Sequence, residues 1–74
     1  MDLILERGTS VVAVEIKASA TVTASDTLPM RELREALGKR FKLGIVATLG
    51  RTADVLDRSI CVVPLGSLLG VGRR

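Results

Sequence analysis

Three charged residues near the start of the chain have the types and spacing of a divalent-cation site. They are Asp2, Glu15 and Lys17, and the turn sequence Arg7-Gly8-Thr9-Ser10 lies between them. If this turn closes a two-residue hairpin, counting back along the two strands places Asp2 opposite Glu15 on one face. Lys17 lies two residues beyond Glu15 and therefore shares that face. Opposed carboxylates repel each other, so the pattern is typical of a site that holds a cation.

The chemistry of this cluster suits a hard metal ion. Mg²⁺ or Mn²⁺ takes oxygen ligands, commonly from one or two carboxylates completed by water. A bound ion polarises a phosphoryl group and lowers the pKa of its water, so no histidine base is required. The alternative is a surface cluster at the sheet edge in which Lys17 neutralises Asp2 and Glu15. Exposed ion pairs of this kind contribute only about 0–1 kcal/mol to stability.

The composition excludes several classes of function. The chain has 74 residues, no histidine, one cysteine and one aromatic residue, Phe41. These absences argue against Ser-His or Cys-His catalysis, an ordinary zinc site and an aromatic platform for single-stranded nucleic acid. No phosphate-binding loop occurs, so we expect no ATP site in this chain. The net charge of +3 permits contact with a polyanion without requiring it.

The chain has more apolar surface than a domain of this size can bury. A domain this short buries only about 60% of its unfolded surface, yet 47% of the residues are hydrophobic. We therefore expect another chain, or another part of a longer parent protein, to cover some of it. Its apolar runs are too short to span a bilayer, and no signal peptide opens the chain. With Cys61 unpaired, these features predict a cytoplasmic protein with no membrane partner.

Hydrophobic periodicity and turn residues predict a single mixed α/β (α+β) domain. The expected strands are 2–6, 11–17, 43–49 and 60–63, and the expected helices are 28–41 and 65–69, with a flexible tail at 70–74. Asp26 or Thr27 is expected to cap the long helix. Residues 18–26 and 52–59 are expected to be loops. Because a helix connects the second and third strands, these two should be parallel in a small sheet of about four strands.

This arrangement resembles a known nuclease core. An acidic residue, a hairpin and a Glu-x-Lys unit ending an apolar strand, followed by a crossover helix, resemble the restriction-endonuclease-like, PD-(D/E)xK superfamily. More narrowly, residues 2–6 and 12–19 look like the C-terminal domain of unknown function of a family of bacterial and archaeal AAA-type ATPases. The later matches are Ser25-Asp26, Leu33-Arg34, residues 41–50 and Val63-Pro64-Leu65. The likeness runs from Asp2 to about Leu69, as one domain over residues 1–74.

The resemblance implies roles for the three residues. Asp2 and Glu15 would be the metal-binding carboxylates, and Lys17 would position the attacking water or stabilise charge on the phosphate. The chain lacks the helix and strand that precede the hairpin in that superfamily, and it lacks the ATPase module. We therefore expect a C-terminal fragment or a stand-alone remnant, with Mg²⁺-dependent phosphodiester hydrolysis belonging to the intact parent rather than to this chain alone.

Two other functions stay open at this stage. The first is a non-catalytic interaction or dimerisation module, in which the sheet edge or the apolar surface pairs with a second copy. The second is simple DNA binding through basic residues, which would weaken steeply with salt.

Overall fold

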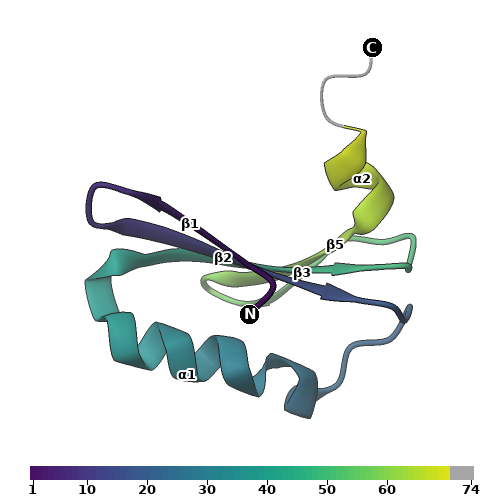
Figure 1. Cartoon of the computed structure of the whole chain (residues 1–74). Coiled ribbons are helices and arrows are strands. Elements are labelled where there is room, and N and C mark those ends of the chain that lie inside the picture. The colour runs from purple at the N-terminus through teal and green to yellow at the C-terminus, as the bar shows by residue number, and fades with distance from the viewer. Residues whose placement is uncertain (71–74) are drawn as a thin grey trace.

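A mixed five-stranded sheet with a helix across one face forms the domain, as the computed structural model of residues 1–70 shows (Figure 1). The strand order is β1-β2-β3-β5-β4. The strands are β1 (Leu3–Arg7), β2 (Ser10–Lys17), β3 (Phe41–Thr48), β4 (Asp54–Asp57) and β5 (Ile60–Pro64), and the α-helices are α1 (Leu28–Leu37) and α2 (Leu65–Leu69). Two 3₁₀ turns, η1 (Ala24–Thr27) and η2 (Gly38–Arg40), flank α1. The α/β fold class is confirmed, with one strand more than predicted.

The register of the N-terminal hairpin is the predicted one. Arg7 pairs with Ser10, and the antiparallel ladder continues to Leu3 opposite Val14. Gly8 adopts a φ of 62° at the turn, a left-handed conformation that glycine reaches without steric cost. The sequence pattern therefore fixes which side chains of β1 and β2 share a face.

The crossover through α1 makes β2 and β3 parallel, as predicted. The helix is shorter than the expected 28–41, because Gly38 follows Leu37 with a φ of 57° and ends it. Phe41 begins β3 instead of ending the helix. Its ring still joins the buried cluster that includes Met30, so the apolar spacing identified a core residue but assigned it to the wrong element. No helix in residues 1–70 is long and apolar enough to cross a membrane.

The additional strand is β4, and it lies in the segment 52–59, for which the prediction of a polar loop was wrong. Asp54-Val55-Leu56-Asp57 pairs antiparallel with β5, with a register shift between Val55 and Asp57. Four residues with an acid at each end carry too little apolar alternation to be recognised as a strand. The ladder with β5 supplies the stabilisation that the local sequence lacks. The predicted tail at 70–74 falls mostly on residues 71–74, which lie outside the described part of the chain.

The core lies between α1 and one face of the sheet. Its buried cluster consists of Ala13, Met30, Phe41, Val46, Ile60 and Val62. Met30 is 1% exposed and points at the middle of the sheet, where Gly44 of β3 has no side chain. A Cβ at Gly44 would overlap the Met30 Sδ and lie 2.9 Å from the Phe41 Cζ. The missing side chain is therefore what allows α1 to lie this close to β3.

Gly44→Ala should lower the free energy of unfolding by about 1–3 kcal/mol, because an added methyl group forces Met30 and Phe41 out of a filled core. Gly66→Ala is the matched control, since nothing lies within 4 Å of the position where its Cβ would be. Urea unfolding followed by circular dichroism measures both variants. Equal stability of the two variants would contradict the close approach of α1.

Candidate functional site

The predicted site residues lie at one edge of the sheet. β2, β3 and β5 are mutually parallel, so their carboxyl ends meet there. Glu15 and Lys17 belong to the end of β2, and Asp2 directly precedes β1, which runs beside it. Ligands of open α/β sheets bind outside the carboxyl ends of such strands. The edge is thus a suitable place for a site.

Asp2 is fixed against β2 by its own side chain. The backbone N–H of Ile16 donates a hydrogen bond of 2.7 Å to the Asp2 Oδ2. The ladder ends at Leu3 opposite Val14, and continuing its register by one step would set Asp2 opposite Glu15. The bond occupies one carboxylate oxygen, which leaves the second oxygen as the available ligand atom.

Glu15 lies on the face of β2 that α1 covers. It shares this face with the buried Ala13, and in the neighbouring strand its partner is Val46, another residue of the core. The side chain is half-buried because it stands just beyond the end of that core. Among residues 1–70, the Glu15 carboxylate takes part in none of the three ion pairs. Its carboxylate is therefore available to a cation at this edge.

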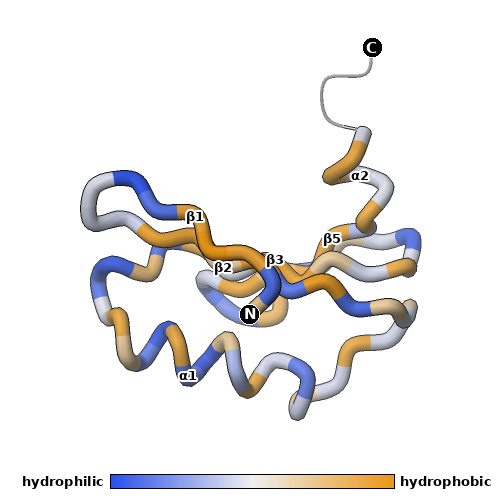
Figure 2. Tube along the Cα trace, viewed as in Figure 1, coloured by the Kyte–Doolittle hydropathy of each residue, from blue (hydrophilic) through white to orange (hydrophobic). Residues whose placement is uncertain are grey.

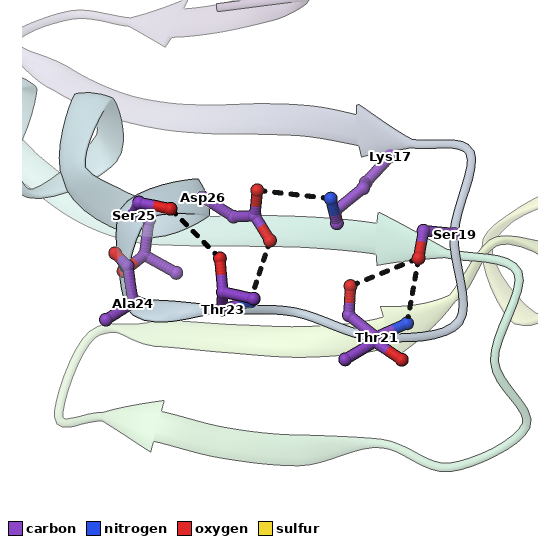
Figure 3. A network of polar contacts seen from close by, with 8 residues as sticks. Lys17, Ser19, Thr21, Thr23, Ala24, Ser25 and Asp26 are labelled. Atoms are coloured by element: carbon purple, nitrogen blue, oxygen red, sulfur yellow. Dashed lines mark hydrogen bonds and ion pairs between the residues drawn. The ribbon is translucent and has the colours of Figure 1, made fainter.

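Lys17 forms an ion pair that sequence reasoning did not identify. Its Nζ lies 3.1 Å from the Asp26 Oδ1 (Figure 3). The Asp26 Oδ2 accepts a 2.7 Å hydrogen bond from the Thr23 backbone N–H. The pKa of Asp26 lies below its ordinary value of 3.8 because of this backbone hydrogen bond and, next, the bond from Lys17. Of the two expected caps of the long helix, Thr27 occupies the N-cap position of α1 but makes no side-chain capping hydrogen bond. Asp26 is the third residue of η1 and completes a capping box with Thr23 instead.

The crossover loop that carries Asp26 is held by short polar contacts. The Thr21 backbone N–H donates to the Ser19 Oγ at 3.1 Å, and the Thr23 and Ser25 hydroxyls lie 3.1 Å apart. Figure 3 shows these hydroxyls along the return path from β2 to η1. Small hydroxylated residues that bond to nearby backbone groups are typical of such turns. The loop therefore delivers Asp26 to Lys17 in a defined position.

The metal-binding capacity of this edge rests on two carboxylates. Residues 1–70 contain no group of three or more His, Cys, Asp or Glu side chains that could hold a metal ion. Asp2 and Glu15 supply hard oxygen ligands of the kind and number that Mg²⁺ uses when water fills its other positions. The donor set consequently fits a hydrated Mg²⁺ or Mn²⁺ and does not fit an ion that demands a full protein cage.

A second ion pair joins α1 to the turn between β4 and β5. Arg34 donates to both carboxylate oxygens of Asp57, at 2.7 and 3.0 Å, and to the Ser59 Oγ at 3.0 Å. The hydrogen bonds from Arg34 lower the pKa of Asp57, and the same pairing raises the pKa of Arg34. Asp57 falls in the segment 52–59 that was expected to be a loop, so its pairing with Arg34 could not be identified from the sequence. This contact fixes the helix and lies away from the carboxyl ends of the strands.

A pocket of about 300 Å³ lies on the helix side between the crossover and β4. It is lined by Val22, Thr23, Ala24, Thr27, Arg31, Leu56, Asp57 and Ile60. None of the three predicted site residues belongs to this lining, so the pocket and the carboxylate edge are separate features.

The paired acids predict acid sensitivity. In the folded chain the pKa values of Asp26 and Asp57 lie below their ordinary values. At a pH between the folded-state and unfolded-state pKa of each residue, the unfolded chain therefore binds more protons than the folded chain. Their contribution is complete above the unfolded pKa and is lost as pH falls through the folded pKa. The thermal midpoint should therefore drop as pH falls from about 5 toward 2.

Asp26→Asn should make this drop shallower, because one of the two titrating groups is removed. Glu32→Gln, which alters an exposed carboxylate outside the ion pairs of residues 1–70, should leave the slope unchanged. Calorimetry across the pH series measures all three proteins, and an identical slope in Asp26→Asn would count against the Lys17–Asp26 pair.

Comparison with known proteins gives one match. Residues 1–68 match the model of a family described as a domain of unknown function, DUF4143. The match extends from the start of the chain into α2 and so includes Asp2, Glu15, Lys17 and Asp26. No curated protein matches the chain, and no solved structure matches it.

Proposed function

Since the chain belongs to the family of the domain of unknown function DUF4143, we propose that it is the nuclease-like part of an ATPase-family protein. In this proposal the carboxyl edge of the sheet binds Mg²⁺ or Mn²⁺ and supports hydrolysis of a phosphodiester in nucleic acid. The domain acts in the cytoplasm beside the ATPase module of the parent protein. Catalysis belongs to the intact parent.

One observation carries the proposal: the hairpin register, continued by one step, would pair Asp2 with Glu15. The ladder from Arg7 opposite Ser10 to Leu3 opposite Val14 leads directly to this pair, and the Ile16 N–H holds Asp2 there at 2.7 Å. Two neighbouring carboxylates repel unless a cation or a proton lies between them. A divalent ion supplies that charge and activates a bound water.

Lys17 has a positional role in this scheme. Its side chain is 28% exposed and its ammonium pairs with Asp26, which keeps the long side chain at the same edge as Glu15. An ammonium at this place stabilises negative charge on a phosphate oxygen. The ion pair with Asp26 limits the rotamers of Lys17 before substrate arrives.

The first experiment measures metal binding directly. Mg²⁺ or Mn²⁺ titrated into ¹⁵N-labelled protein should shift or broaden the amide resonances of Asp2, Glu15, Ile16 and Lys17. Glu15→Gln should weaken binding about tenfold or more, since it removes one of two charged ligands. Glu32→Gln on α1 is the matched control and should bind as the unaltered chain does.

The outcomes separate a metal site from a surface cluster. Unchanged spectra at millimolar metal, or equal binding by both variants, would overturn the proposal. Cleavage of nucleic acid is then tested on the intact parent protein, comparing the unaltered sequence with Glu15→Gln and Glu32→Gln.

A further inference from the structure

The face of the sheet turned away from α1 is apolar across all five strands. We call it the outer face. It consists of Leu3, Leu5, Val12, Val14, Ile16, Leu43, Ile45, Ala47, Val55, Cys61 and Val63. Figure 2 shows the concentration of hydrophobic residues along β1, β2 and β3, and α2 rises on this side only at the carboxyl end of β5.

Much of the outer face is open to solvent. Leu3, Leu5 and Ile16 are 48%, 52% and 51% exposed, and Val55 is 71% exposed. Parallel strands are normally covered on both faces of their sheet. Here α1 covers one face, and α2 covers the other only at the carboxyl ends of β3 and β5. Soluble monomers rarely expose a contiguous apolar patch larger than a few hundred Å². The outer face is therefore a surface that a partner covers.

The charge pattern selects the chemistry of that partner. Charged side chains occur only at the hairpin end of the outer face, where Arg7 follows Leu3 and Leu5 at alternate positions of β1 and the exposed Lys42 lies at the register shift between β2 and β3. The charged residues of α1 lie on the opposite side of the sheet. A nucleic acid or an acidic peptide would find no cation to pair with over the remaining, apolar part of the face. A second outer face offers a matching apolar surface, and a two-fold axis perpendicular to the strands sets the two basic ends at opposite ends of the contact.

The area of the outer face suits a reversible dimer. Five strands about 4.8 Å apart, each about six residues long at about 3.3 Å per residue, cover roughly 24 by 20 Å. Two such faces in contact remove roughly 1,000 Å² from solvent, near the lower bound for a specific interface. An interface of this size is typical of a reversible contact rather than an obligate dimer.

We propose that the outer face is a homodimer interface, in which two copies pack sheet against sheet. Aligned sheets of this kind cross at about −30° and interdigitate their apolar side chains. A two-fold axis places each protruding residue in both halves of the contact. Glu15 and Lys17 lie on the other face of the sheet, so this inference goes beyond the metal site and does not depend on it.

The test compares two exposed leucines on opposite sides of the molecule. Leu5 on the outer face is 52% exposed and Leu28 at the start of α1 is 46% exposed. In sedimentation equilibrium over micromolar concentrations, the unaltered chain should show a monomer–dimer equilibrium. Leu5→Glu should weaken it about 100-fold or more, because symmetry buries two unpaired carboxylates in each interface. Leu28→Glu should leave the dissociation constant within about two-fold of the original, because Leu28 lies outside the interface.

A second variant distinguishes loss of the interface from loss of the fold. Val55→Glu alters the outer face on β4, where the side chain is 71% exposed, and it should dissociate the dimer as Leu5→Glu does. Circular dichroism checks that each variant keeps its strands and helix. A chain that stays monomeric throughout the concentration series would overturn the proposal. So would a dimer that both outer-face variants leave intact, or one that Leu28→Glu weakens equally. None of these results bears on metal binding by Asp2 and Glu15.

Discussion

The close approach of α1 to the sheet at Gly44 is the contact on which the rest of this small fold depends. Met30 reaches the middle of the sheet because β3 has no side chain there. That depth sets the position of the whole crossover, and with it the place where η1 meets the end of β2. The Lys17–Asp26 pair at 3.1 Å is one product of this placement. A single missing Cβ thus links core packing to the geometry of the carboxylate edge.

The parts of the fold that local chemistry determines could be predicted from the sequence. The turn around Gly8 sets the hairpin register, and the helix between β2 and β3 requires them to be parallel. The neighbourhood of Asp2 and Glu15 follows from that register alone. What sequence reasoning missed depends on contacts distant along the chain. β4 exists through its ladder with β5, and Asp26 meets Lys17 only because the crossover returns beneath β2. Phe41 is an intermediate case: its burial could be predicted, but its position in β3 rather than in the helix could not.

The domain places its two candidate surfaces on different sides of one sheet. Glu15 and Lys17 lie on the face of β2 toward α1, whereas the apolar side chains without cover lie on the outer face. Packing on the outer face would therefore leave the carboxylate edges of both copies open to solvent. Burial on both faces would also relieve the main weakness of a chain of 74 residues, which is the small core that one helix and one sheet face can form.

The two edge strands of the sheet differ in a way that bears on its growth. β4 is four residues long, has an aspartate at each end and contains a register shift, all of which discourage another strand from joining it. β1 is five residues long, exposed throughout and starts with Leu-Ile-Leu. Within residues 1–70, the edge at β1 is therefore the more open of the two to a further strand. Growth into a fibre requires two sheet edges that each accept a strand of another copy. Only the edge at β1 suits such pairing within residues 1–70, so pairing two copies through their β1 strands would use up the open edge of both.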